Sequence, residues 1–348
     1  MISSVPNTTP AAFFSAAWAQ FDAAQGENWR DSLRVGGTNC LIEGKGHGMR
    51  QALLPALAHL KSDVSVAPQL HLRTWDGAET HGGLPPLPVI AGDAFEHGRI
   101  ARLCSDSHLV IWEPHFSSVT LLDRIGRRAI YFATSAQALP YYETAAPLRA
   151  LWHAWFSSQG ALPVHGACVG RNGRALLLTA PAGSGKSTTA LLALAAGFDY
   201  LADDWSLLQP RGGPFAHSLF NTAKLRPNNL HRFPALRERI HNFDRLDDEK
   251  ATIFLQQHFP SQLRASAQLK AIVLPRVSGK PDTHFERTSS AAAWHALLKV
   301  TAQGVAGSGR ELFTLLGELV RCAPVYTLHL GHQLDQVHRA LEAILQDE

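Results

Sequence analysis

Residues 175–197, ALLLTAPAGSGKSTTALLALAAG, carry the strongest structural signal in this chain. They begin with a short apolar run, continue through a loop with two glycines, and end in a segment of strong helix formers. The loop fits the GxxxxGK[ST] pattern of a phosphate-binding turn, except that Ala180 stands at its first position. A strand, a glycine-rich loop and a helix in this order predict an α/β core.

The loop has the residue types that phosphate binding requires. Gly183 and Gly185 allow successive backbone N–H groups to point at one place, where the positive end of the following helix dipole adds its effect. Lys186 is expected to reach the terminal phosphates, and Ser187 to bind Mg²⁺ through its hydroxyl. The expected nucleotide-binding residues are Ala182, Gly183, Ser184, Gly185, Lys186, Ser187 and Thr188.

ATP is the expected nucleotide, because no guanine-specific NKxD-like motif follows the loop. The alternative interpretation of the loop itself is a glycine-rich connection between a strand and a helix that binds no ligand.

Two adjacent carboxylates follow the next apolar segment. Asp203 and Asp204 come after Tyr200-Leu-Ala, about one helix downstream of Lys186. In phosphate-loop proteins the end of the neighbouring strand brings a carboxylate beside Mg²⁺ and the terminal phosphate. One of the pair can bind the metal while the other accepts a proton from an attacking hydroxyl. A turn or helix cap is the alternative for either aspartate.

A histidine precedes the loop. His165 lies in VHGACV, which predicts a strand, and a hairpin at 171–173 would return the chain toward the phosphate-binding loop. Gly166 beside it permits close approach of another backbone. The spacing alone fits a site residue and an ordinary core histidine equally well.

The remaining sequence predicts two domains. The first 35 or so residues read as helical, with Phe13, Phe14, Ala17, Trp18 and Phe21 in an apolar stripe. Residues 48–61 read as a helix, 99–134 as an antiparallel meander and 148–159 as an amphipathic helix. We therefore expect an α+β domain over 1–147 and the α/β domain over 148–348.

Further elements are expected in the C-terminal part. Residues 271–277 and 325–330 read as buried strands, and 291–300, 311–321 and 334–345 as helices. The loop Gln303–Arg310 is either a second anion- or substrate-binding loop, with Arg310 reaching phosphate, or a flexible surface loop.

Composition excludes several classes of protein. The 348 residues are 45% hydrophobic and 18% charged, which suits a packed globular chain. A net charge of +3 is too weak to argue for nucleic acid or an anionic membrane. No segment reads as a secretory signal or membrane span, and the four cysteines are scattered, so we expect a cytoplasmic protein with reduced thiols.

The order of His165-Gly166, the glycine-rich loop and Asp203-Asp204 resembles the HPr kinase/phosphorylase family. That family has a P-loop core of the phosphoenolpyruvate carboxykinase type and phosphorylates a serine hydroxyl of a protein. The resemblance extends from about residue 148 to the C-terminus and is strongest over 163–208. It implies a kinase that uses ATP and Mg²⁺.

The resemblance also implies residue roles. His165 matches the family's active-site histidine, Lys186 and Ser187 its phosphate and Mg²⁺ residues, and Asp204 its catalytic base. The family's second signature contains a glutamate that binds Mg²⁺, but residues 225–232 here contain no carboxylate. Metal binding is then expected to rest on Ser187 and Asp203. Lys224 or Arg226 would hold phosphate, or belong to an exposed basic loop.

The function expected from this resemblance is phosphorylation of a serine on a peptide or protein. Divergent HPr-kinase-like proteins of natural-product pathways suggest a ribosomal precursor peptide, such as a lasso peptide, as substrate. The alternatives are a kinase for a small hydroxyl metabolite such as free serine, and a non-catalytic ATP-binding regulator. Residues 1–147 do not resemble the family's N-terminal domain. Their helices and meander carry no recognisable chemistry, so they are expected to recognise the substrate or to serve as an accessory domain. A homo-oligomer is compatible with the sequence.

Overall fold

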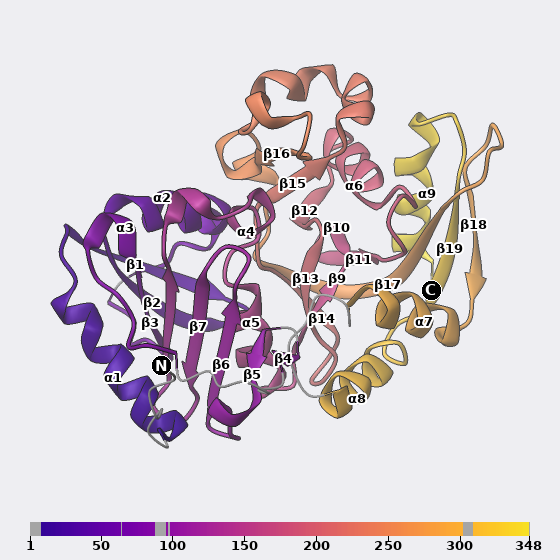
Figure 1. The fold of residues 1–348 in the computed structure, drawn as a ribbon. Coiled ribbons are helices and arrows are strands. Elements are labelled where there is room, and N and C mark those ends of the chain that lie inside the picture. The colour runs from indigo at the N-terminus through magenta and orange to yellow at the C-terminus, as the bar shows by residue number, and fades with distance from the viewer. Residues whose placement is uncertain (1–7, 64, 88–94, 97, 302–308, 348) are drawn as a thin grey trace. The chain divides into compact units, whose positions relative to one another are not determined.

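The computed structural model describes residues 8–63, 65–87, 95–96, 98–301 and 309–347 (Figure 1). The chain is a mixed α/β protein that divides into two compact units, one up to Trp155 and the other from Phe156 to the C-terminus. The division falls inside helix α5 (Arg149–Ser157), whereas the sequence places the boundary before that helix. The 303–308 part of the predicted anion-binding loop lies outside the described residues.

The N-terminal unit is built on one mixed sheet. Its described strands have the order β1-β2-β3-β8-β7-β6-β5-β4, with β2, β3 and β8 parallel to one another and the other pairs antiparallel. The strands are β1 (Asn28–Val35), β2 (Thr38–Lys45), β3 (Leu70–Asp76), β4 (Phe95–Glu96), β5 (Arg99–Ile100), β6 (His108–Glu113), β7 (Ser118–Asp123) and β8 (Arg128–Ala133). The helices before α5 are α1 (Pro10–Ala23), α2 (His47–Leu57), α3 (Gly77–Thr80) and α4 (Tyr141–Thr144).

The prediction of helix over the first 35 residues is wrong beyond Ala23. Residues 28–35 form the edge strand β1, along which buried and more exposed side chains alternate, with Trp29, Leu33 and Val35 among the buried ones. A period of two is the mark of a half-buried strand. The sequence therefore predicts this strand when residues 28–35 are considered apart from the apolar helical pattern before them.

The helical stripe itself is core, as expected. Thr9 caps the N-terminus of α1 by accepting a hydrogen bond from the Ala12 backbone. Phe13, Phe14 and Phe21 are buried against one face of the sheet, in a cluster that includes Trp75.

The predicted helix over 48–61 is confirmed by α2 and the short 3-10 helix that follows it. The meander is confirmed for β6, β7 and β8, while its first segment forms only the two-residue strand β5 before a 3-10 turn.

The C-terminal unit contains a second mixed sheet. Its order is β12-β10-β11-β17-β14-β13-β9, with β19 paired to β17 and β18 to β19. The strands are β9 (Leu162–His165), β10 (Ala167–Arg171), β11 (Arg174–Leu178), β12 (Asp199–Ala202), β13 (Trp205–Gln209), β14 (Phe215–Ser218), β17 (Ser266–Val277), β18 (His284–Thr288) and β19 (Val325–Leu330), and a separate pair consists of β15 (Thr222–Leu225) and β16 (Ala251–Phe254). The helices are α6 (Lys186–Ala195), α7 (Ser290–Thr301), α8 (Gly309–Leu319) and α9 (Asp335–Gln346), which confirms the elements expected here.

Helices cover both faces of this second sheet. Along β11, Leu176 and Leu178 pack with α6 and α9, whereas Ala175 and Leu177 pack with α7 and α8. Both faces of the strand are buried, which explains its unbroken apolar sequence. The predicted hairpin at 171–173 joins β10 to β11 through Asn172 and Gly173, both with positive φ.

A long connection between β15 and β16 contains the 3-10 helices η4 (Pro227–Arg232) and η5 (Pro234–Arg239). Buried Asn242 holds it: its amide nitrogen donates to the Lys250 carbonyl at 2.9 Å and its oxygen accepts from the Thr252 backbone at 2.8 Å. The connection is therefore fixed against the strand pair at its return end.

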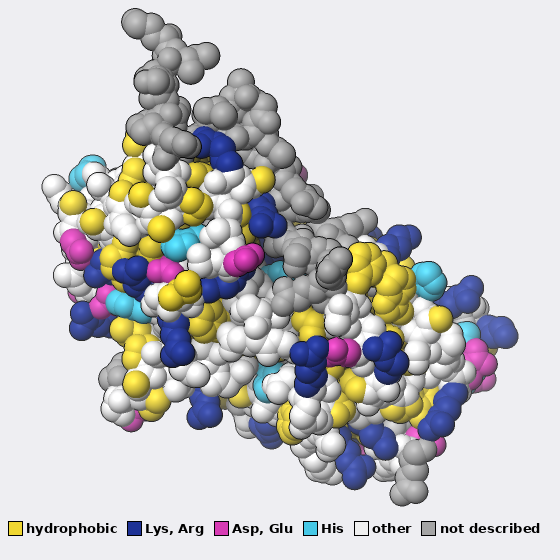
Figure 2. Space-filling model, turned by 90° about the horizontal axis from the view of Figure 1, so that it is seen from below, with side chains coloured by type: hydrophobic (Ala, Val, Ile, Leu, Met, Phe, Trp, Pro, Cys, Tyr) yellow, Lys and Arg dark blue, Asp and Glu magenta, His cyan; other side chains and the backbone are white. Residues whose placement is uncertain are grey.

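The surface has no dominant charge feature on the face drawn in Figure 2, where Lys and Arg side chains are scattered among uncharged ones. None of the described helices is both long enough and apolar enough to cross a membrane.

One prediction tests the two-faced burial of the second sheet. Val273 on β17 is fully buried, while Val277 on the same strand is 60% exposed. Replacing Val273 by Ala should lower the free energy of unfolding by about 2 kcal/mol, from two lost buried carbons and the cavity they leave. Val277→Ala is the matched control and should change it by less than about 0.5 kcal/mol. Urea denaturation measures both, and equal effects would contradict this packing.

Candidate functional site

The glycine-rich loop joins β11 to α6 as predicted. Gly183 and Gly185 have φ of +85° and +99°, a left-handed conformation that favours glycine. A side chain on Gly183 would meet no atom within 4 Å, so the loop is open there, whereas one on Gly185 would come within 2.6 Å of Leu330. Gly185 directly precedes the first turn of α6, which leaves the N–H groups of that turn available to an anion.

Lys186 lies at the start of α6, with its ammonium over the loop. Its Nζ donates to the carbonyls of Ala180 at 2.5 Å and Pro181 at 3.2 Å. Burial lowers the pKa of Lys186, an effect that Asp203 and Asp204 oppose. Ala180 contributes only its backbone carbonyl to this contact. The contact is therefore unaffected by the presence of alanine where the motif has glycine.

Ser187 and Asp203 meet as the sequence predicts. The Ser187 hydroxyl donates to Asp203 Oδ1 at 2.9 Å. Asp203 is buried and also accepts the backbone N–H groups of Asp204 at 3.0 Å and Lys224 at 3.0 Å. Burial, followed by the neighbouring Asp204 charge, raises the pKa of Asp203 to about 6. A hydroxyl and a carboxylate oxygen are thus held side by side.

Asp204 sits in a strained turn. Its φ is +62°, and the Trp205 N–H donates to the Asp203 carbonyl at 2.7 Å, which makes a γ-turn centred on Asp204. Across the ladder, Gly166 donates its N–H to the Asp204 carbonyl at 2.8 Å. A side chain on Gly166 would lie 2.9 Å from the Leu178 carbonyl. Strain held in place by its neighbours is common at functional sites.

The Asp204 carboxylate is paired with a buried lysine. Lys224 Nζ lies 3.0 Å from Asp204 Oδ2, and His165 Nε2 lies 3.8 Å from Oδ1. Burial raises the pKa of Asp204, but the charges of Lys224, Lys250 and His165 together hold it well below its usual range. Lys224 belongs to strand β15 and is buried, so the alternative of an exposed basic loop is wrong for this residue.

His165 ends β9 opposite Trp205, whose ring it meets edge-on at 5.5 Å between centroids. Its backbone N–H donates to the Thr301 hydroxyl at 3.2 Å. Burial lowers the pKa of His165 to about 4, although Asp204 opposes the shift, so the ring is neutral at pH 7. Its Nδ1 has no hydrogen-bond partner among the described residues.

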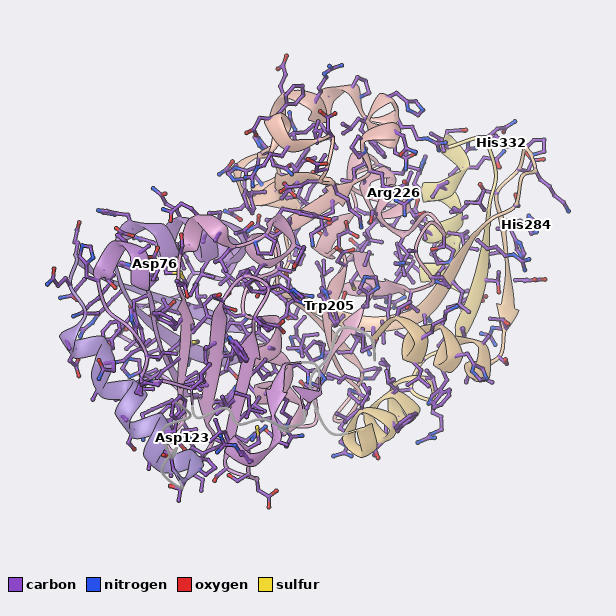
Figure 3. The ribbon with its side chains drawn as sticks, viewed as in Figure 1. Asp76, Asp123, Trp205, Arg226, His284 and His332 are labelled. Atoms are coloured by element: carbon purple, nitrogen blue, oxygen red, sulfur yellow. The ribbon has the colours of Figure 1, made fainter. Side chains whose placement is uncertain are left out.

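A pocket of about 650 Å³ opens over these groups. It brings in two residues that the sequence did not suggest, because they lie far along the chain: Lys250 just before β16 and His332 after β19. Arg232, the last residue of η4 and part of the predicted basic loop, also lines the pocket. Arg226, proposed from sequence as a phosphate contact, also lines the pocket, and Figure 3 labels it together with His332 and Trp205.

The residues present fit a nucleotide with Mg²⁺. Ser184 Oγ and Thr189 Oγ1 are buried without a partner within the described chain, and both belong to the loop or the first turn of α6. The Ser187 hydroxyl and the Asp203 carboxylate are hard oxygen ligands of the kind Mg²⁺ prefers. The described residues contain no group of three or more His, Cys, Asp or Glu side chains that could hold a metal ion. Mg²⁺ here would therefore take its other ligands from phosphate and water, as is usual for this ion.

Comparison with known proteins gives little more. No family model matches the chain, and no curated protein matches it. Among solved structures it is similar to the Hpr(Ser) kinase/phosphatase from Coxiella burnetii, with 10% identity over 53% of this chain and 93% of that chain, and a TM-score of 0.30. A likeness this low leaves the functional argument to the site itself.

The strain at Asp204 can be measured. Both Asp204→Gly and Asp204→Ala remove the partner of Lys224, but only Gly accepts φ of +62° freely. The Gly variant should be more stable than the Ala variant by about 1 kcal/mol in urea denaturation. The same two substitutions at Asp199, whose φ is not positive, are the control and should give the opposite order. The same order at both positions would exclude strain as the cause.

The titration of His165 tests the charge arrangement. Its ring Cε1–H signal in an NMR titration should report a pKa near 4 and a neutral ring at pH 7. Asp204→Asn should lower this pKa further, because it removes the charge that favours the protonated ring. Asp199→Asn, on β12, should leave it unchanged. A pKa of 6 or more in the native protein would contradict the buried placement.

Proposed function

We propose that this protein is an ATP-dependent phosphotransferase that moves the γ-phosphoryl group to a hydroxyl, the serine hydroxyl of a peptide or protein. One observation carries the proposal: an ionised aspartate, Asp204, is fixed beside a glycine-rich loop whose serine, Ser187, touches a second carboxylate, Asp203. Phosphoryl transfer needs these parts together, namely an anion cradle, a metal position and a group that accepts the hydroxyl proton.

The loop and α6 bind the phosphates in this proposal. The N–H groups from Gly183 to Thr188 surround the phosphate oxygens, and Lys186 turns from its loop carbonyls toward them. Ser187 and Asp203 would hold Mg²⁺, which when bound would offset negative charge on the phosphates. Lys186 also balances charge that develops on the transferred group.

Asp204 acts as the base. Its low pKa keeps it ionised at neutral pH, and the transition state of phosphoryl transfer is loose, so the hydroxyl need not be deprotonated early. Lys224 fixes the carboxylate through Oδ2, and Oδ1 faces His165. Neutral His165 then orients Asp204 or the phosphate without adding a charge.

Two other functions remain in competition. A kinase for a small hydroxyl metabolite such as free serine would use the same chemistry. A regulator that only binds ATP would have no use for Asp204 in its strained turn, and this disfavours it. Within the proposal, residues 1–147 recognise the substrate, a cytoplasmic peptide for which a ribosomal precursor of the lasso type is one candidate.

Two variants separate binding from chemistry. Asp204→Asn should reduce phosphoryl transfer by about 10²–10⁴-fold with little change in ATP affinity, because Asp204 does not touch the loop. Lys186→Ala should weaken both. ATP affinity is measured by calorimetry and transfer by mass spectrometry, with Asp199→Asn as the control. Undiminished transfer by Asp204→Asn would refute the role of Asp204.

The class of acceptor is tested with the unmodified protein. Incubation with MgATP and either seryl peptides or free serine, followed by mass spectrometry, should give a mass increase on the peptides only. Phosphorylation of free serine alone, with no mass increase on the peptides, would favour the metabolite kinase. If ATP raises the melting temperature but no acceptor is modified, the regulator is favoured.

A further inference from the structure

The pocket over the phosphate-binding loop has two chemically different ends. Near α9 it is lined by apolar side chains from β17, β19 and α9, namely Val277, Leu330, Leu334 and Val337. Near β15 and η4 it is lined by cationic and polar side chains, namely Lys224, Arg226, Asn229, His231, Arg232 and Lys250. Asp204 and His165 also line the pocket.

Two of the cations in the pocket already have a role in the proposed function. Lys186 belongs to the phosphate-binding loop, and Lys224 is paired with Asp204 at 3.0 Å. Arg226, Arg232 and Lys250 remain, and within the described chain none of the three has an acidic side chain at ion-pair distance. Asp204 is the only carboxylate lining the pocket among the described residues. Positive charge at this end therefore exceeds what the protein itself neutralises.

The surplus positive charge lines the same pocket as Asp204, the proposed catalytic carboxylate. Lys250 is half-buried and lines the pocket, and its charge acts on Asp204, His165 and Lys186. Arg226 and Arg232 are exposed and stand at the two ends of η4. In the proposed function, Lys186 and Mg²⁺ offset the charge of the triphosphate. The hydroxyl that reaches Asp204 must arrive beside the remaining cations.

The backbone that carries these cations is held in place by packing and hydrogen bonds. Asn242 fixes the Lys250 carbonyl. Phe233 and Leu236, which follow η4, are buried in the core with α6. Side chains on a fixed backbone segment lose less conformational freedom on binding than side chains on a free loop.

We propose that Arg226, Arg232 and Lys250 form a carboxylate-binding subsite for the acceptor, so that the substrate is a serine peptide with acidic residues next to the serine. The inference rests on the proposed phosphotransfer, because it assigns the basic end of the pocket to the acceptor. Arginine pairs with carboxylates through two parallel hydrogen bonds, which suits selection for acidic side chains.

Peptide binding tests the subsite without any phosphoryl transfer. The probes are fluorescein-labelled Ala-Gly-Ser-Glu-Glu-Glu and its Gln counterpart, Ala-Gly-Ser-Gln-Gln-Gln, both amidated, with the full chain loaded with MgADP. Fluorescence anisotropy at low salt should show the Glu peptide binding at least about tenfold more tightly. The Arg226→Gln/Arg232→Gln double variant and Lys250→Met should each remove most of this preference.

Arg237→Gln is the matched control, because Arg237 is exposed in η5 and does not line the pocket. It should keep the preference unchanged. MgATP affinity of the Arg226→Gln/Arg232→Gln variant, measured by calorimetry, should stay within about twofold of the native value. Equal binding of the two peptides would overturn the proposal. A large loss of MgATP affinity with an unchanged peptide preference would also overturn it, by assigning the arginines to the nucleotide.

Competition with free amino acids tests whether the bound carboxylate belongs to a peptide. Free glutamate or free serine that displaces the Glu peptide at comparable concentration would overturn the assignment to a peptide. If the Glu peptide binds as expected but ATP neither binds nor transfers its phosphoryl group, the proposed function fails while the anion subsite stands. If transfer occurs equally to Glu and Gln peptides, the proposed function stands and the subsite fails.

Discussion

The buried ion pair between Asp204 and Lys224 is the contact on which the arrangement of the site depends. It joins the β12–β13 turn to strand β15, and the same strand supplies the backbone N–H that holds Asp203. Breaking a buried pair leaves an uncompensated charge and costs several kcal/mol, roughly 3–5. Each partner therefore fixes the position of the other. The carboxylate that faces the pocket is consequently placed by the β15–β16 pair as much as by the phosphate-binding loop.

This dependence explains the contrast between the two aspartates. Adjacent in sequence, they differ in environment: Asp203 accepts a hydroxyl and two N–H groups, whereas Asp204 faces lysine and histidine. Burial and the nearby negative charge raise one pKa, while surrounding cations depress the other. Two carboxylates with separated pKa values can take different roles at one pH.

Local sequence predicted the parts of this site that are contiguous. The strand, loop and helix over 175–197, the hairpin before them and the contact of Ser187 with Asp203 all follow from spacing and residue type. Lys224 was expected only as a phosphate contact or as part of an exposed basic loop. Neither its pairing with Asp204 nor the place of Lys250 could be found this way, because strand pairing across a long connection brings both lysines to the site. In the N-terminal unit the helix prediction wrongly includes strand β1, because the apolar helical pattern before this strand is stronger than the two-residue alternation within it.

The left-handed backbone at Asp204 also restricts how this position can change in evolution. Aspartate, asparagine and glycine tolerate such a conformation, whereas β-branched and bulky residues do not. Asparagine keeps the shape of the side chain and its short reach but cannot accept a proton as a carboxylate does. A single base change in an aspartate codon produces it. Descendants of this protein thus have a short route to a form that keeps this turn while losing the carboxylate and its pairing with Lys224.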